Sequence, residues 1–265
     1  MKAAQKSKKI HQKTNTWYQK RTGERVEILG LAINSTQKEQ VLRLLTLQRK
    51  ELLHLATVNP EYVMQARMYP DFAKVLSQSI TTADGWGIVW AARLLKDRSI
   101  ERVSGTSLVE EILRLADKRE EKVFLLGAGE GVAAQAASLM NIRYPHAKIS
   151  FYEGAENIRL ERREEASMTI ARINAVSPDY LLVAYGSPRQ DMWIEENRPY
   201  LRARVAMGVG GVLDEWAGLV AVCPAWIDQI GLKWAWRLAH EPKRFFRVLR
   251  VFQFATLVLY HKLID

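Results

Sequence analysis

Residues 122–132 read KVFLLGAGEGV, and this stretch indicates the fold class of the 265-residue chain. Its first part, 122–127, is a short apolar run, which is typical of a strand buried on both faces of a parallel sheet. Glycines follow at once, and a helix is predicted over 131–143. A strand that runs through a glycine turn into a helix is the repeating unit of α/β proteins.

The same alternation of strand and helix continues on both sides of this stretch. Further strands are predicted at 26–33, 52–58, 79–83, 148–152, 180–186 and 204–210, and further helices at 36–50, 60–77, 85–96, 106–119, 160–175, 188–197 and 213–219. We therefore predict an α/β fold with a mostly parallel, Rossmann-like sheet and helices on both of its faces. The pattern does not give the order of the strands.

Positive charge is concentrated at the two ends of the chain, whose formal net charge is +10. Residues 1–26 contain eight Lys and Arg and one Glu, a net +7, and residues 231–265 contain seven and two acids, a net +5, which leaves −2 for the middle. We predict three parts: a basic N-terminal tail (1–25), an α/β domain (26–222) and a helical C-terminal appendage (223–265). This distribution suits an anionic surface or substrate that approaches from particular sides.

The composition excludes several classes of protein and site. The single Cys223 excludes a disulfide framework and a cysteine-based zinc site, and the five histidines show no metal-ligand spacing, so no metal site is predicted. The N-terminal residues lack the apolar segment of a signal peptide, and no run approaches the ~20 apolar residues of a membrane-spanning helix. These features predict a cytoplasmic protein.

The sequence KRFFRVLRVFQFATLVLYHKLI, residues 243–264, predicts a largely apolar helix with a narrow polar stripe. Arg244, Arg247, Arg250 and Gln253 recur every three residues along it. Two interpretations stay open. Either the helix docks on the α/β domain with its arginines at the rim, or its apolar face lies on a membrane surface with the arginines toward phosphates.

Ligands of open α/β sheets bind beyond the carboxyl ends of the strands, so the loops at those ends are candidate sites. Thr57 and Asn59 end one predicted strand, and Asp84 follows another, directly before Gly85. Asn and Asp are also residue types that cap helices. A carboxylate at a strand end could instead act as a general base. The residues alone leave both interpretations open.

Glycine-containing strand ends favour a ligand that carries phosphates. Gly127, Gly129 and Gly131 would let backbone N–H groups approach a phosphate at a helix N-terminus. Further glycines end the strands at 180–186 and 204–210. The third glycine comes one position too early for the dinucleotide motif G-x-G-x-x-G. Together these strand ends predict a nucleotide-type pocket.

Nine groups of residues occur in an order that resembles one family of bacterial glycosyltransferases. They are Thr57-x-Asn59, Ala83-Asp84-Gly85, Arg102-x-x-Gly105-Thr106, Phe124 to Gly127 with Gly131-Val132, Tyr144-Pro145, Gly186-Ser187-Pro188-x-Gln190, Gly208 to Gly211 with Asp214, Pro224-x-Trp226, and Gly231 to Leu238 with Glu241-Pro242, Arg244 and Arg247. On these motifs the chain is similar to the WecG/TagA/CpsF family over residues 26–250.

The resemblance implies an inverting, metal-independent transfer of an N-acetylmannosamine-type sugar from a UDP donor. The acceptor would be N-acetylglucosamine linked to undecaprenyl diphosphate, at the inner face of the cell membrane, in the synthesis of teichoic acid or another surface polysaccharide. The implied partners are the UDP-sugar, this polyprenyl-diphosphate acceptor and an anionic membrane surface, with no cofactor and no nucleic acid. A homo-oligomer remains open.

Residue by residue, the resemblance also implies roles in this chain. Asp84 would be the catalytic base, which takes the proton of the acceptor hydroxyl. Thr57, Asn59, Arg102 and Gln190 would surround the donor and the reacting centre, Asp214 would lie near the uridine, and Arg237, Arg244 and Arg247 would meet the diphosphate and the membrane. Guanidinium groups can neutralise a leaving diphosphate where no metal is available.

Two positions depart from the family pattern. Lys233 stands where the family usually has Glu in a Gly-Leu-Glu-Trp segment, and Ala155 replaces an aromatic residue after the strand at 148–152. The first change would alter a local ion pair. The second would move base stacking elsewhere, for example to Phe151 or Tyr152. Both bear on the identity of the donor sugar more than on the fold.

Two alternative functions stay open at the level of the sequence. The glycines from Gly127 to Gly131 would also suit a Rossmann-type NAD(P)-binding oxidoreductase, and the pI of about 9.7 would suit a nucleic-acid-binding protein. The net charge of −2 in the middle of the chain argues against the second. The oxidoreductase would bind nicotinamide nucleotides, whereas the glycosyltransferase would bind UDP.

Overall fold

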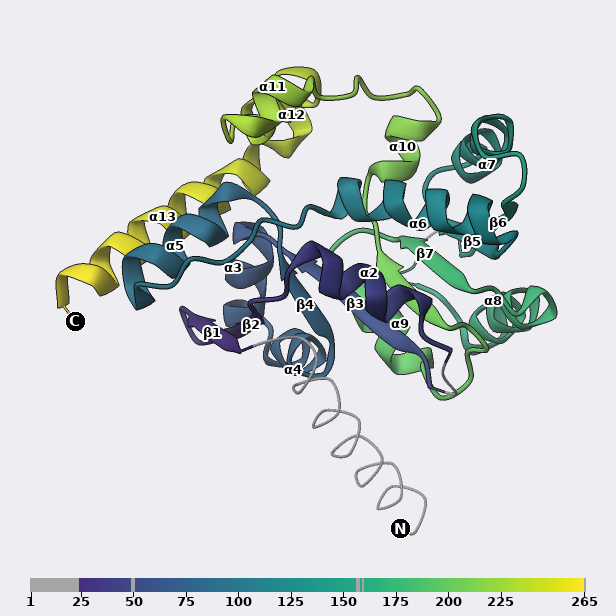
Figure 1. Ribbon diagram of the computed structural model, residues 1–265, viewed down its shortest axis with the longest axis horizontal. Coiled ribbons are helices and arrows are strands. Elements are labelled where there is room, and N and C mark those ends of the chain that lie inside the picture. Colours follow the sequence, from purple (N-terminus) through teal and green to yellow (C-terminus); the bar gives the residue numbers. More distant parts are fainter. Residues whose placement is uncertain (1–23, 49–50, 156–157, 159, 265) are drawn as a thin grey trace, which may run out of the picture.

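The computed structural model describes residues 24–264, except 49–50, 156–157 and 159 (Figure 1). The strands are β1 (Arg25–Ile28), β2 (Leu31–Asn34), β3 (Leu53–Val58), β4 (Ile80–Ala83), β5 (Lys122–Gly127), β6 (Lys148–Tyr152), β7 (Tyr180–Ala184) and β8 (Val205–Gly208). The predicted basic tail, 1–25, lies outside the described residues apart from its last two, and Arg25 already belongs to β1.

Helices separate most of these strands. They are α2 (Lys38–Thr46), α3 (Pro60–Met68), α4 (Pro70–Gln78), α5 (Trp86–Lys96), α6 (Gly105–Arg119), α7 (Val132–Arg143), α8 (Arg163–Val176), α9 (Arg189–Asn197), α10 (Val212–Trp216), α11 (Ala225–Gln229), α12 (Lys233–His240) and α13 (Phe245–Ile264), with the 3₁₀ helix η1 (Pro242–Arg244) between the last two.

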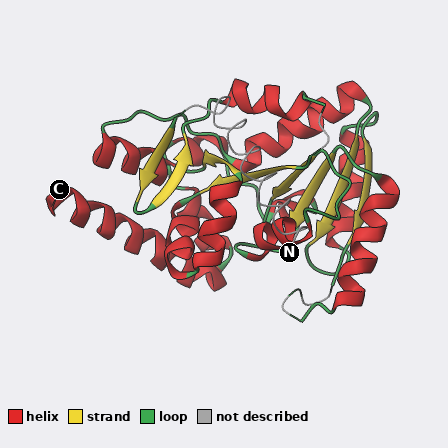
Figure 2. Ribbon diagram, turned by 90° about the horizontal axis from the view of Figure 1, so that it is seen from below, coloured by secondary structure: helices red, strands yellow, loops and turns green. Residues whose placement is uncertain are grey.

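Six strands form one parallel sheet in the order β4-β3-β8-β7-β5-β6. Helices cover both of its faces (Figure 2). The predicted α/β class with a parallel, Rossmann-like sheet is therefore confirmed. All six carboxyl ends point to the same edge of the sheet, which is the edge where the predicted site residues lie.

The apolar side chains of the central strands pack into cores on both faces of the sheet. In β5, Val123 and Leu125 pack into a core with α2, α6 and α7, whereas Phe124 and Leu126 pack into a second core with α8 and α9. Because successive side chains of a strand point to opposite faces, a strand covered on both sides must be apolar throughout. This explains why 122–127 shows no alternation with polar residues.

The prediction of one strand over 26–33 is wrong. The segment forms an antiparallel hairpin of β1 and β2, which is separate from the main sheet. Leu29 and Gly30 both have positive φ, 49° and 86°, as the tight turn of a two-residue hairpin requires. Residues on both strands of the hairpin are buried, so the sequence is largely apolar and gives no sign that the chain reverses its direction.

The prediction of one helix over 60–77 is also wrong. α3 ends at Met68, and α4 begins at Pro70. Tyr69 between them has an extended backbone, with φ of −124° and ψ of 96°. Proline disfavours a helical conformation in the residue before it and cannot donate a backbone hydrogen bond, so it starts a new helix here.

The C-terminal appendage is helical from α11 to α13, as predicted. α13 packs along α3 and α5, and its Val248, Phe254 and Val258 are buried. Phe254 and Val258 belong to the same core as Ile88 of α5. Docking of this helix on the α/β domain is therefore confirmed, while contact of its exposed side with a membrane and the boundary at 222/223 stay predictions.

Candidate active site

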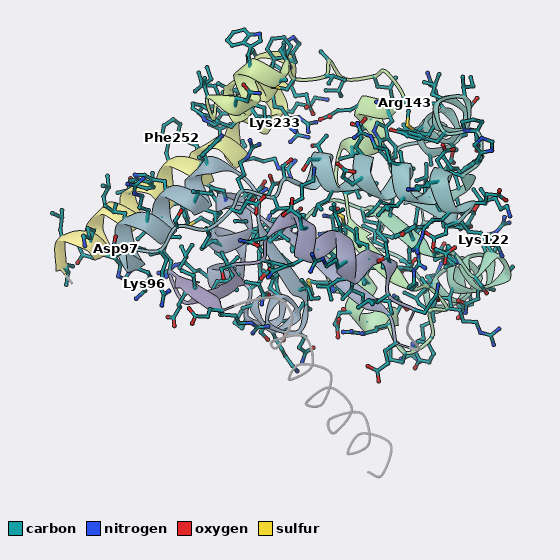
Figure 3. The ribbon with its side chains drawn as sticks, in the orientation of Figure 1. Lys96, Asp97, Lys122, Arg143, Lys233 and Phe252 are labelled. Atoms are coloured by element: carbon teal, nitrogen blue, oxygen red, sulfur yellow. The ribbon has the colours of Figure 1, made fainter. Side chains whose placement is uncertain are left out.

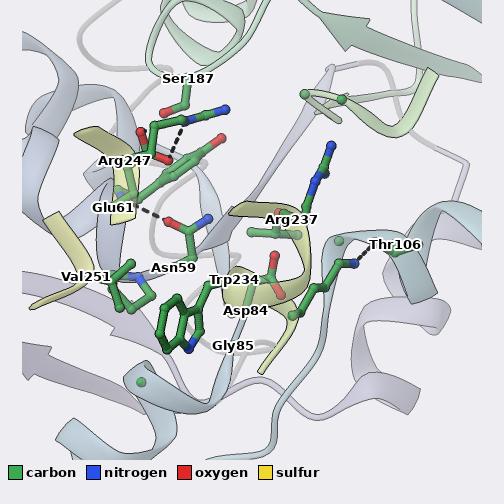
Figure 4. Close-up of a pocket in the computed structure, with 18 of the residues that line it drawn as sticks. Asn59, Glu61, Asp84, Gly85, Thr106, Ser187, Trp234, Arg237, Arg247 and Val251 are labelled. Atoms are coloured by element: carbon green, nitrogen blue, oxygen red, sulfur yellow. Dashed lines mark hydrogen bonds and ion pairs between the residues drawn. The ribbon is translucent and has the colours of Figure 1, made fainter. Parts of the chain in front are cut away.

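A pocket of about 380 Å³ lies between the carboxyl ends of β3, β4, β7 and β8 and the C-terminal appendage (Figure 4). It brings together eight of the predicted site residues: Thr57, Asn59, Asp84, Arg102 and Gln190 from the α/β domain and Arg237, Arg244 and Arg247 from the appendage. The pocket occupies the place where open α/β sheets bind their ligands.

Asp84 lines this pocket directly after β4. Its amide donates a 2.7 Å hydrogen bond to the carbonyl of Val58, which fixes the backbone at the strand end. The N-cap of α5 is Gly85, with φ of 94°, a conformation that favours glycine. The interpretation of Asp84 as a helix cap is therefore wrong, and its side chain remains available to the pocket.

The surroundings of Asp84 suit a proton acceptor. Burial raises the pKa of its carboxyl, while the charges of Lys233 and Arg102 and a hydrogen bond from the Gly105 amide lower it in part, and the net change is upward. A carboxylate with a raised pKa binds a proton more readily than an ordinary aspartate. The geometry and this shift together make Asp84 the candidate general base.

α6 begins in contact with both Asp84 and Thr57. A Cβ atom at Gly105, its first residue, would lie only 2.9 Å from Thr57 Oγ1 and 3.6 Å from Asp84 Oδ2. The absence of a side chain at Gly105 allows this close approach and brings its amide to the Asp84 carboxyl. Thr57 itself is only 6% exposed.

Asn59 serves as a helix cap and lines the pocket as well. Its Oδ1 accepts a 3.0 Å hydrogen bond from the amide of Tyr62 at the start of α3. The capping interpretation is thus confirmed for Asn59. Its amide group also lies at the pocket, and a contact with substrate stays a prediction.

Gln190 connects the pocket wall to the protein interior. Its Nε2 donates a 2.8 Å hydrogen bond to the Tyr62 hydroxyl, and its Oε1 accepts one of 3.0 Å from the amide of Gly210. A Cβ atom at Gly208 would collide with the Gln190 side chain. Gln190 therefore holds the glycine-rich segment after β8 in place.

Tyr62 continues this connection into a buried charged network. Its hydroxyl donates a 2.8 Å hydrogen bond to Asp191 Oδ2, and the other oxygen of Asp191 lies 3.2 Å from His54 Nε2. Burial by itself lowers the pKa of His54, but its hydrogen bonds and charge interactions with Asp191 and Glu195 outweigh this and raise it. The network gives the pocket a rigid, fully buried support.

Two arginines of the appendage share one carboxylate. Arg237 lies 2.8 Å from Glu241, and Arg244 lies 2.7 Å from the other oxygen of Glu241. Arg237 also forms a 3.0 Å ion pair with the buried Glu215 of α10. Burial alone would raise the pKa of Glu241, but the two guanidinium groups lower it overall.

Further ion pairs join the appendage to the α/β domain. Arg247 and Arg250 of α13 both lie 3.0 Å from Glu61 of α3. Arg102 pairs with Asp228 of α11 at 2.5 Å. Each of the four pocket arginines therefore already has a carboxylate partner.

Two groups of predicted site residues do not line the pocket. The glycines at 127, 129 and 131 lie beside it along the sheet edge, and the amide of Gly131 donates a 2.7 Å hydrogen bond to Glu153. That carboxylate occupies the helix N-terminus where a phosphate was predicted. Asp214 is not itself a lining residue, but it lies next to one: a Cβ atom on Gly211 would be 3.3 Å from Asp214 Oδ2.

Several pocket residues were not predicted as site residues. They include the carboxylates Glu61, Glu215 and Asp228, the cation Lys233, and Trp86 and Trp234. Lys233 donates a 2.8 Å hydrogen bond to Thr106, and in Figure 3 it lies on the part of the appendage that faces the α/β domain. Its departure from the family pattern was the signal in the sequence that could have drawn attention to it.

Comparison with known proteins gives the family. The model of the family described as "Glycosyl transferase WecG/TagA/CpsF family" matches residues 26–265. The chain belongs to this family. A relative from Bacillus subtilis (strain 168) is 34% identical over 206 residues, 77% of this chain and 78% of the relative. One from Staphylococcus aureus (strain MRSA252) is 31% identical over 229 residues, 84% of this chain and 88% of the relative. Both are named N-acetylglucosaminyldiphosphoundecaprenol N-acetyl-beta-D-mannosaminyltransferase.

The protein is thus a glycosyltransferase, and neither the oxidoreductase nor the nucleic-acid-binding alternative is supported. Within residues 24–264, leaving out the few that are not described, no cluster of His, Cys, Asp and Glu has the arrangement of a metal site. In the same part of the chain no helix is both long and apolar enough to cross a membrane.

Proposed function

We propose that this glycosyltransferase moves N-acetylmannosamine from a UDP donor to N-acetylglucosamine linked to undecaprenyl diphosphate. The sugar and the acceptor are those in the names of the two relatives, which align with about four fifths of this chain. The observation that carries the proposal is the pocket itself, where the Asp84 carboxylate, which forms no ion pair with an arginine among the described residues, shares the lining with arginines of the appendage. A base and a set of fixed cations are the groups that displacement of UDP needs.

In the proposed reaction, the acceptor hydroxyl attacks the anomeric carbon of the donor sugar from the face opposite to UDP. The new glycosidic bond forms as the bond from the anomeric carbon to the diphosphate oxygen breaks, so the configuration inverts. Asp84 takes the proton of the attacking hydroxyl. Its burial supports this role because a desolvated carboxylate is a stronger proton acceptor than one in water.

The arginines neutralise the charge that develops on the departing UDP, and neither a metal nor a cofactor is needed in this scheme. Guanidinium groups form bidentate hydrogen bonds with phosphate oxygens and stay charged at any physiological pH. Arg237 and Arg244 converge on Gly211 at the end of β8, since a Cβ atom there would lie 3.1 and 3.3 Å from their Nη2 atoms. A diphosphate at this strand end would lie within reach of both.

The enzyme acts on the cytoplasmic face of the membrane, where the lipid-linked acceptor is held. Large apolar side chains are exposed along the appendage: Trp226, Ile230, Leu232, Phe245, Phe246, Leu249, Phe252, Leu259, Tyr260, Leu263 and Ile264. Lysines and arginines of the same segment can contact lipid phosphates. Exposed apolar side chains and basic residues within one segment support peripheral attachment to an anionic bilayer.

Replacement of Phe245 and Phe246 by serine should weaken binding to anionic vesicles by tenfold or more. The two side chains are 53% and 74% exposed, and each phenylalanine that enters the bilayer contributes roughly 1.5–3 kcal/mol. Co-sedimentation with phosphatidylglycerol vesicles measures the effect. Leu139→Ser/Ile142→Ser on α7, also exposed, is the matched control and should bind as the unmodified protein does. Unchanged binding of the Phe245/Phe246 variant would contradict attachment through α13.

A transfer assay tests the proposed reaction directly. The full-length enzyme is incubated with an undecaprenyl-diphosphate N-acetylglucosamine analogue and either UDP-N-acetylmannosamine or its epimer UDP-N-acetylglucosamine. We expect a disaccharide product by mass spectrometry only with the manno donor, and a β-linkage by NMR. Activity should persist in EDTA. A product of retained configuration, or no transfer from any UDP-sugar, would refute the proposal.

A further inference from the structure

The positive charges of the pocket are unequally compensated. The four arginines that line it, Arg102, Arg237, Arg244 and Arg247, each form an ion pair with a carboxylate. Lys233 lines the same pocket, but its Nζ donates a 2.8 Å hydrogen bond to the neutral hydroxyl of Thr106. Among the described residues no carboxylate pairs with it. An ammonium group has three N–H donors, so two remain for a ligand.

The ammonium of Lys233 is held next to the reacting centre. Its partner Thr106 follows Gly105, whose amide donates a hydrogen bond to Asp84. After burial, which raises the pKa of Asp84, the charge of Lys233 is the largest influence on that carboxyl and lowers its pKa. The dashed line at Thr106 in Figure 4 marks the hydrogen bond that this hydroxyl accepts from Lys233.

We propose that Lys233 binds an oxyanion of the donor substrate beside Asp84 and thereby helps to select the donor. This inference rests on the proposed function. A cation whose hydrogen-bond partner is neutral and that forms no close ion pair gains more from a bound oxyanion than an arginine that must first release a carboxylate. The oxyanion is the diphosphate of the proposed UDP-N-acetylmannosamine donor or, should the donor be the corresponding uronic acid, the carboxylate of its sugar. Both sources require the same chemistry of Lys233.

Calorimetric titration of the full-length protein distinguishes the two sources. The ligands are UDP, UDP-N-acetylmannosamine and the corresponding UDP-linked uronic acid, each titrated into the unmodified protein and into Lys233→Met. Loss of one charge-assisted hydrogen bond should raise Kd by about tenfold. If the oxyanion is the diphosphate, Lys233→Met raises the Kd of all three ligands. If the oxyanion is the sugar carboxylate, Lys233→Met raises the Kd of the UDP-linked uronic acid alone.

Two control variants separate this role from simpler ones. Lys243→Met removes the same charge from an exposed position of the appendage that does not line the pocket, and it should leave the three Kd values unchanged. Thr106→Val breaks the anchoring hydrogen bond but keeps the ammonium, so it should weaken binding less than Lys233→Met does.

Three outcomes would overturn the inference. Equal Kd values for Lys233→Met and the unmodified protein with every ligand would show that Lys233 contacts no oxyanion. Equal losses in Thr106→Val and Lys233→Met would make Lys233 a tether of the appendage. Failure of the unmodified protein to bind any UDP ligand would refute the proposed function itself, and the inference with it.

Discussion

Asp84→Asn should lower kcat for sugar transfer by about 10²–10⁴-fold, which is the usual contribution of a positioned general base. Asparagine has nearly the same shape, and its carbonyl oxygen can still accept the hydrogen bond from the Gly105 amide. It cannot take a proton from the acceptor hydroxyl. The affinity for UDP, measured by calorimetry, should change by no more than a few-fold, because the base acts on the acceptor.

The pH dependence of the unmodified enzyme gives a second readout of the same residue. Burial raises the pKa of Asp84 above its ordinary 3.8, and the base works only when ionised. The kcat/KM value should therefore fall as the pH drops through this raised pKa, and the residual activity of Asp84→Asn should lack this acidic limb. An Asp84→Asn enzyme with near-normal kcat would refute the assignment.

Arg237→Ala should lower kcat/KM by about 10²-fold, the order found when one preorganised charge-stabilising donor is removed. Arg237 lines the pocket and reaches the end of β8 at Gly211, so its guanidinium is placed for the departing diphosphate. Arg237→Lys keeps the charge but loses the planar fork, and should recover only part of the activity. Steady-state kinetics with UDP-N-acetylmannosamine measure both variants.

Loss of Arg237 also leaves Glu215 buried without its 3.0 Å partner, which by itself would destabilise the fold. The double variant Arg237→Ala/Glu215→Gln removes the unpaired charge. Its melting temperature should return toward that of the unmodified protein, whereas its kcat/KM should stay low. Recovery of activity together with stability would show that Arg237 has a structural role alone.

The fold class could be predicted because the central strands are covered on both faces. Their side chains must be apolar at every position, so 122–127 and 180–186 stand out as continuous runs. The same rule misled at 26–33, where a hairpin with both strands partly buried produces an equally continuous run. A turn at Leu29 and Gly30 depends on two positive φ angles, and leucine gives no indication of one.

The sequence motifs predicted several of the residues that line the pocket but not the local role of each one. Asp84 and Asn59 are both short polar residues after a strand, and the sequence cannot tell which one caps a helix. The structure assigns the cap to Asn59 because Asp84 is followed by Gly85 in a conformation that starts α5 without it. The two residues differ in the backbone conformation at the start of the helix that follows each of them.

Of the carboxylate partners of the arginines, only Glu241 has a sequence spacing that could have indicated the contact. Glu241 lies between α12 and η1, three residues before Arg244 and four after Arg237, so both contacts are local in the sequence. Glu61 and Glu215, in contrast, reach their arginines from other elements of the chain, and that proximity exists only in the folded protein. The glycines from Gly127 to Gly131 show the opposite case, a plausible phosphate motif whose helix N-terminus binds Glu153 instead.

The burial of Phe254 and Val258 would couple the proposed membrane attachment of α13 to the position of the candidate base. α13 packs along α5, and α5 begins two residues after Asp84. The helix proposed to rest on lipid and the helix that follows the candidate base therefore pack against each other in one core. With α13 on the bilayer, Asp84 stands at a fixed height above the lipid surface. In this proposed arrangement the acceptor would have to present its sugar at that height, so the length of the diphosphate that joins sugar to lipid would decide which acceptors reach the base.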